Sequence, residues 1–114
     1  MKAVFYVLTR PELLQKLLSH LQQNGICGCT IFESKGMARE LANSDNEHVI
    51  TGFLRSFFSQ ESLRHSCTLM LVLPEEKVAR LLACIKEVAG DMTQPDTGIF
   101  FSVPIDFVEG FKQQ

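Results

Sequence analysis

The sequence carries no excess of positive charge and no long apolar run. Its 114 residues include 11 Lys and Arg against 13 Asp and Glu, so the formal net charge is -2 and the pI about 5.9. This balance argues against a nucleic-acid partner, because proteins of that class normally have a basic surface and a high pI. Without a run of about 18 apolar residues, no membrane insertion is expected. The N-terminus lacks a signal-peptide pattern, so the expected location is cytoplasmic.

Cysteine spacings typical of zinc or redox sites are also missing. The chain has four cysteines, Cys27, Cys29, Cys67 and Cys84, and none of them forms a Cys-x-x-Cys pair. Cys27 and Cys29 are predicted to lie on one side of a strand, as small apolar residues beside the core or, alternatively, as part of a soft-metal site. The sequence has no glycine-rich phosphate loop, metal triad or nucleophile elbow, so no enzymatic activity is expected.

Hydrophobic residues are abundant, and in the first third of the chain their spacing predicts two strands and a helix. Hydrophobic residues make up 46% of the sequence, which is enough for the core of one domain over residues 1–114. A β-branched and aromatic run predicts a strand at Lys2–Leu8. Leucines at helical spacing predict a helix from Pro11 to Gly25, where glycine favours the helix end. Residues 28–33 follow as a second strand.

The last part of the chain repeats this order. A strand is predicted at 67–73, a helix between Pro74 and Gly90, and a last strand at 99–103. Two strand–helix–strand units predict a ferredoxin-like α+β fold, βαββαβ, with a four-stranded antiparallel sheet and two helices on one face. The uncovered face is predicted to be apolar and to be buried in an oligomer. The apolar tail residues Phe107, Val108 and Phe111 are expected to pack back on the domain.

A long insert, residues 37–66, separates the two halves between the second and third strands. Its first part is polar with charges of both signs, and its second part has apolar residues at amphipathic helical spacing. These residues are Ile50, Phe53, Leu54, Phe57 and Phe58. Two interpretations are open: the helix packs on its own domain or trimer, or it docks on a partner protein through its aromatic side chains.

Three segments resemble the P-II signalling proteins. Residues 26–36, Ile-Cys-Gly-Cys-Thr-Ile-Phe-Glu-Ser-Lys-Gly, are similar to the second strand of that family and the Lys-Gly turn that opens its T-loop. Residues 68–85 resemble its third strand and second helix. Residues 96–105, Asp-Thr-Gly-Ile-Phe-Phe-Ser-Val-Pro-Ile, resemble its B-loop and last strand. The three segments occur in the family's order and cover nearly the whole chain apart from the insert.

The resemblance implies a homotrimeric signal-transduction regulator. P-II-like proteins bind adenine nucleotides or other small effectors in clefts between subunits, and their T-loops dock on transporters or enzymes. The residues at the corresponding positions form the predicted effector site, with Lys112 as a remaining cation. They are Thr30, Gly36, Met37, Ala38 and Arg39 at the strand and T-loop base, and Asp96, Thr97 and Gly98 at the B-loop.

The sequence departs from the family where phosphate is bound. The B-loop lysine of the family falls at Gly98, and its pair of arginines falls near Gly110 and Lys112. Phosphate needs cationic side chains and main-chain N–H groups close together, so the usual mode of ATP binding is not expected. The sequence leaves three possibilities open for the effector: a less charged nucleotide, another small ligand or no ligand.

The alternative function is a CutA-like metal-binding trimer, with Cys27, Cys29, Cys67, His20, His48 and His65 as candidate ligands.

Overall fold

The computed structural model describes residues 1–42, 65–94 and 97–111. Its main elements are β1 (Lys2–Leu8), α1 (Leu14–Gln23), β2 (Thr30–Ser34), α2 (Met37–Ala42), β3 (Ser66–Leu73), α4 (Val78–Ala89) and β4 (Ile99–Pro104). Short 3-10 helices, η1 (Pro11–Leu13) and η3 (Glu75–Lys77), lead into α1 and α4. None of the helices in these ranges is long and apolar enough to cross a membrane.

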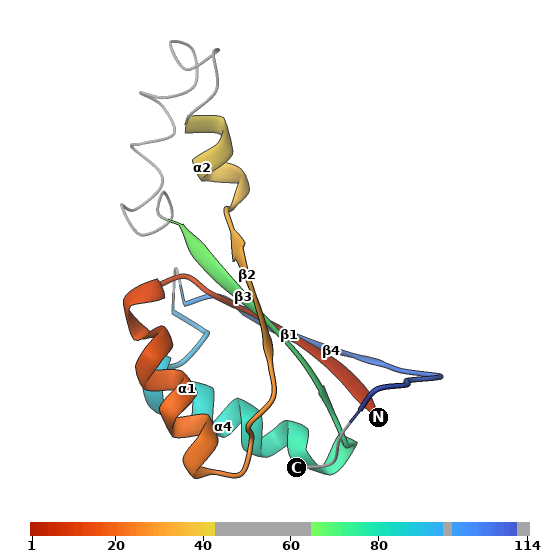
Figure 1. Ribbon diagram of the computed structural model, residues 1–114. Coiled ribbons are helices and arrows are strands. Elements are labelled where there is room, and N and C mark those ends of the chain that lie inside the picture. Colours follow the sequence, from red (N-terminus) through yellow and green to blue (C-terminus); the bar gives the residue numbers. More distant parts are fainter. Residues whose placement is uncertain (43–64, 95–96, 112–114) are drawn as a thin grey trace.

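The four strands form one antiparallel sheet in the order β2-β3-β1-β4. β1 pairs with β3 on one side and with β4 on the other, while β2 pairs with the outer edge of β3. Both long helices, α1 and α4, lie side by side on the same face of this sheet (Figure 1). The predicted α+β fold, with four antiparallel strands and two helices on one face, is therefore confirmed.

The core lies between the sheet and these two helices. Alternate residues of the central strands point into it, since successive side chains of a strand face opposite sides. β1 contributes Val4, Tyr6 and Leu8, and β3 contributes Leu69, Leu71 and Leu73. The helices supply the predicted stripes, with Leu17, Leu21, Leu81 and Ile85 fully buried.

Glycines end both helices, as the sequence predicts. Gly25 and Gly90 have φ angles of 79° and 90°, in the region that residues with a Cβ rarely adopt.

Polar contacts join the segment of α1 to α4. His20 Nε2 lies 2.6 Å from a Glu87 carboxylate oxygen, and the Arg10 guanidinium donates to the Ala89 carbonyl.

The structure differs from the sequence predictions in several details. The second strand begins at Thr30 and ends at Ser34, two residues later at its start and one later at its end than predicted. The first part of the insert contains a helix, α2, which at six residues is too short to give a periodic signal. Phe107 does not pack back on the domain, because its side chain is 80% exposed. Residues 43–64, which hold the rest of the insert, lie outside the described ranges.

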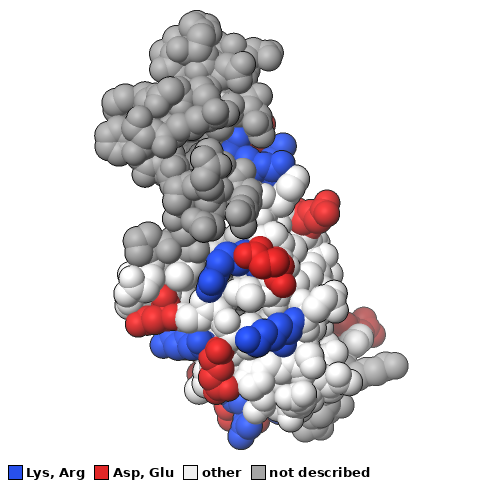
Figure 2. All heavy atoms as spheres, turned by 90° about the vertical axis from the view of Figure 1, so that its left-hand side faces the viewer, with Lys and Arg blue, Asp and Glu red and all other residues white. Residues whose placement is uncertain are grey.

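The second face of the sheet has no helix over it among the described elements. Phe5 and Phe101 stack on this open face with ring centroids 5.2 Å apart. Ile99, Phe101 and Val103 of β4 are 57%, 45% and 41% exposed. The helix side of the molecule is different, since acidic and basic side chains are scattered over it (Figure 2). The predicted apolar, uncovered sheet face is thus present.

Candidate effector site

The base of the insert is built where β2 ends and β3 begins. The hydroxyl groups of Ser34, Ser66 and Thr68 meet there on the open face, with Ser34 Oγ 2.7 Å from Ser66 Oγ and 2.9 Å from Thr68 Oγ1. These residues face one another because Ser34 pairs with Ser66 in the sheet register. The hydroxyl cluster holds the two ends of the insert together.

Charged side chains add a second layer at this base. Lys35 Nζ lies 2.8 Å from a Glu40 carboxylate oxygen, and this hydrogen bond and charge hold the pKa of Glu40 below its usual value. Arg39 contacts both ring nitrogens of His65, and its Nη2 donates to Nε2 at 2.7 Å. Guanidinium can only donate, so this contact requires an imidazole nitrogen with a free lone pair. Of the predicted site residues, Arg39 is therefore engaged within the chain.

Gly36 precedes α2, which begins at Met37 beside these contacts. The Gly36 carbonyl accepts a hydrogen bond from the Glu40 amide at 3.1 Å, which starts the helix. The Met37 side chain is 78% exposed, and Ala38 follows it in the first turn. These predicted residues follow the C-terminal end of β2, where the chain enters α2 (Figure 1).

Thr30 lies at the other end of β2. It pairs with Met70, and it lies four residue positions before Ser34, which is about 13 Å at 3.3 Å per residue. A hollow of about 570 Å³ opens beside it on the open face; we name it the Thr30 hollow. Residues 28–30, Met70 and Val72 form its sheet wall, and residues 108–111 of the tail form the opposite wall. The structure thus separates Thr30 from the predicted residues of the insert base.

The B-loop position lies at the opposite edge of the sheet from the insert base. Gly98 has a φ of 98°, and a Cβ built on it would fall 2.0 Å from the Val7 carbonyl oxygen. No residue with a side chain, lysine included, fits there without movement of the main chain. Thr97 donates a hydrogen bond to the Gln94 carbonyl at 2.7 Å. Asp96 and Lys112 lie outside the described residues.

The two predicted halves of the site do not meet within one chain. They lie at the same end of the sheet, but β2 and β4 are its outer strands, with β3 and β1 between them. Three strand spacings put the two edges about 14 Å apart. Arg39 and Gly98 therefore lie at opposite edges of the sheet within one chain.

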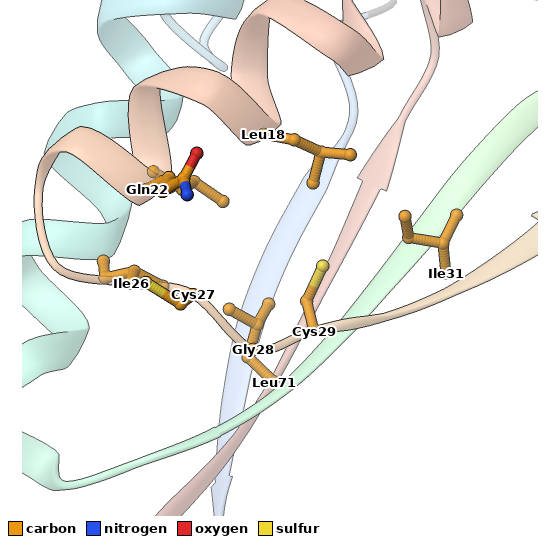
Figure 3. Close-up of a pocket in the computed structure, with 9 residues that line it drawn as sticks. Leu18, Gln22, Ile26, Cys27, Gly28, Cys29, Ile31 and Leu71 are labelled. Atoms are coloured by element: carbon orange, nitrogen blue, oxygen red, sulfur yellow. The ribbon is translucent and has the colours of Figure 1, made fainter. Parts of the chain in front are cut away.

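The cysteines were also considered as metal ligands. Cys29 points into a pocket of about 290 Å³ between α1 and the sheet, beneath Leu18 (Figure 3). Burial raises the pKa of the Cys29 thiol, which favours its neutral form. Within the described ranges, no three His, Cys, Asp or Glu side chains are grouped to hold a metal ion. The CutA-like alternative therefore gains no support; His48, one of its candidate ligands, lies outside these ranges.

Sequence reasoning missed several parts of this region. The contact between Arg39 and His65 joins residues 26 positions apart, and the tail wall of the Thr30 hollow has no periodic pattern. Only the apolar character of Val108 and Phe111 hinted that the tail returns to the sheet. The predicted docking residues Ile50, Phe53, Leu54, Phe57 and Phe58 fall in 43–64, outside the described ranges.

Comparison with known proteins identifies the family. A search of curated proteins finds no match to this sequence. A family model described as "Nitrogen regulatory protein P-II" matches residues 1–114, the whole chain. The match agrees with the three resembling segments and with the observed strand order. On this match and this fold, the chain belongs to the nitrogen regulatory protein P-II family.

Proposed function

We propose that this protein is a cytoplasmic homotrimeric regulator that senses a small effector in clefts between subunits and controls a partner protein through its insert. Family membership supports a role in signal transduction, since P-II proteins are regulators rather than enzymes. The candidate effector is an adenine nucleotide or a related molecule. The candidate partner is a transporter or an enzyme.

The open sheet face is the observation that carries this proposal. Phe5, Phe101 and Val103 present a continuous apolar surface, with Phe32 of β2 47% exposed on the same face. Exposed apolar surface of this kind favours association, because burial is worth about 25 cal/mol per Å² of apolar area. Copies that cover this face would also bring the β2 edge of one chain toward the β4 edge of another.

The Thr30 hollow supports the effector part of the proposal. It borders the open face, so a neighbouring copy on that face would close it further. Its apolar walls, together with main-chain groups at Gly28 and Gly110 and the Thr30 hydroxyl, resemble the composition of small-molecule sites. An effector there would lie against β2, whose far end leads into the insert. This continuity gives a physical route from effector to insert.

A first experiment tests the assembly. Light scattering on the 12.8 kDa chain is expected to give the mass of three copies. Phe101→Asp places a charge on the open face and is expected to give a monomer with an unchanged circular dichroism spectrum. Ser102→Asp is the matched control, because Ser102 is the next residue of β4 and faces the other side. A monomeric wild type, or equal effects of both substitutions, would contradict the proposal.

A second experiment tests the insert. Replacing residues 43–64 by a short Gly-Ser linker leaves α2, Arg39 and His65 in place. The trimer mass is expected to persist, while binding to partners purified from the native host is lost. Phe107→Ala, which removes an exposed aromatic residue outside the insert, is expected to bind them normally. Unchanged partner binding by the linker variant would refute a docking role for the insert.

A further inference from the structure

A pocket of about 290 Å³ lies on the covered face of the sheet, between α1 and β2; we name it the α1 pocket. Side chains from α1, from the segment that joins α1 to β2, and from β2 and β3 surround one common space there (Figure 3). Its wall consists of branched aliphatic groups, which belong to Leu18, Leu21, Ile26, Ile31 and Leu71. The α1 pocket therefore offers a hydrocarbon-like surface to a ligand.

The α1 pocket is closed at its floor and open at its mouth. Leu21, Ile26 and Leu71 are buried and form the floor. Ile31 pairs with Leu69 and so shares the covered face with it, yet Ile31 is 40% exposed whereas Leu69 is 0% exposed. Protein interiors are close packed, with few voids larger than a water molecule. Small-molecule sites, in contrast, are concave and mostly apolar, as this pocket is.

The polar side chains among the described lining of the α1 pocket are an amide and two thiols. Cys27 and Cys29 supply the thiols, and burial raises the pKa of the Cys29 thiol, which favours its neutral form. Gln22 supplies the amide from an exposed position on α1, so it lies at the mouth. An amide donates and accepts hydrogen bonds, and an alcohol hydroxyl also does both. Gln22 can therefore pair with one uncharged polar group at the end of an aliphatic chain.

The volume of the α1 pocket sets the length of that chain. An apolar cavity of about 150 Å³ holds one benzene ring. A volume of about 290 Å³ therefore has room for roughly eight to ten carbon atoms. A ligand of this size would fill the space between Leu18 at the mouth and Leu71 at the floor.

We propose that the α1 pocket binds an uncharged medium-chain aliphatic molecule, with its chain against the leucine and isoleucine wall and its one polar end at Gln22. This site is additional to the effector site of the proposed function, because it lies on the covered face and the Thr30 hollow lies on the open face. Gly28 and Cys29 line both cavities. A ligand in the α1 pocket would therefore lie directly behind one wall of the Thr30 hollow.

Calorimetry on the full chain with 1-octanol, 1-butanol and octanoate tests the ligand class. We expect 1-octanol to bind once per chain. 1-Butanol should bind at least thirtyfold more weakly, because each buried methylene group is worth roughly fourfold in affinity. Octanoate should bind at least fivefold more weakly than 1-octanol at pH 7, since burying a carboxylate beside an amide and thiols costs more than burying a hydroxyl. Equal affinities of the two alcohols, or tighter binding of octanoate, would overturn the proposal.

Substitutions in the wall test the location. Leu18→Trp fills the mouth of the α1 pocket and is expected to weaken 1-octanol binding at least tenfold. Ser19→Trp is the matched control, because Ser19 is the next residue of α1, is exposed and does not line this pocket. Ile31→Ala removes aliphatic contact at an exposed position and is expected to weaken binding at least threefold. Wild-type affinity for 1-octanol in both Leu18→Trp and Ile31→Ala would place the ligand elsewhere and overturn the proposal.

Two further variants separate this inference from the proposed function. Phe101→Asp changes the open face, so it should bind 1-octanol as the wild type does, and loss of binding there would overturn a site within one chain. Replacing residues 43–64 by a Gly-Ser linker should also leave the affinity unchanged. Binding by the linker variant alone would assign the α1 pocket to the insert and overturn the proposal. If the wild type and all variants fail to bind 1-octanol, this inference falls while the regulatory role of the trimer stands.

Discussion

The two faces of the sheet differ in what covers them. On one face, alternate residues of β1 and β3 are buried under α1 and α4, and the outer surface of those helices carries scattered charges of both signs (Figure 2). On the other face, the intervening residues of the same strands are only partly buried, and those of β4 are exposed. Strands that are apolar on both faces therefore indicate two different partners, one within the chain and one outside it.

Truncating neighbouring residues of β3 should give the largest contrast between the faces. Leu69 is 0% exposed under the helices, and Met70 lies next to it on the open face. Leu69→Ala is expected to lower the free energy of unfolding by about 2–5 kcal/mol, since it leaves a cavity. Met70→Ala should cost less than half as much. Urea unfolding of both, in the Phe101→Asp background, measures the difference, and equal losses would contradict it.

A comparison of two glycines extends this contrast to the main chain. Gly90 and Gly98 both have positive φ, but a Cβ at Gly90 meets open space and a Cβ at Gly98 meets the Val7 carbonyl. Both alanine variants are expected to be destabilised by backbone strain. Gly98→Ala is expected to lower the free energy of unfolding by about 1–3 kcal/mol more than Gly90→Ala, because of overpacking. Thermal unfolding measures this. Equal melting temperatures would show that the β1–β4 end adjusts to a methyl group.

Tyr6 lies on the covered face, and its substitution is expected to have the smallest effect on stability at neutral pH. Its hydroxyl is buried with no hydrogen-bond partner among the described residues, and burial raises the pKa of Tyr6 to about 12. Tyr6→Phe should therefore change stability at pH 7 by less than about 1 kcal/mol.

The sign of the pH dependence follows from the raised pKa. The stability that Tyr6 contributes is fully present below the unfolded value of 10.0 and is lost as pH rises from there through about 12. Tyr6 is the only tyrosine of the chain, so ultraviolet absorbance follows it alone. Tyr6→Phe should remove this alkaline loss. A midpoint near 10 in the folded protein would contradict burial of the hydroxyl.

The sequence was sufficient to predict the elements of the two strand–helix–strand units. The leucine stripes of α1 and α4, the strand pattern of β1 and the stop signals at Gly25 and Gly90 depend on local periodicity and on the conformational freedom of glycine. The apolar open face could be predicted for the same reason. These features need only residues close together in the chain.

The candidate site was harder to predict because it depends on register and on where the chain turns back. Arg39 reaches His65 because Ser34 pairs with Ser66 in the sheet. The identity of these two serines does not predict that they pair. Thr30 was grouped with Gly36 from the resemblance, although the length of β2 separates them. Glu109 lies in an irregular tail without any pattern, so its place in the Thr30 hollow could be found only from the structure.

The hydroxyl cluster of Ser34, Ser66 and Thr68 has a consequence for how the insert of this chain can change. It links the exit and the return of the chain at Ser34 and Ser66, which pair directly in the sheet. Lengthening a flexible connection is thermodynamically mild, at about 0.6 kcal/mol for each doubling. The same scaffold can therefore accept segments of different length and sequence by grafting, and new recognition can evolve there without refolding the domain.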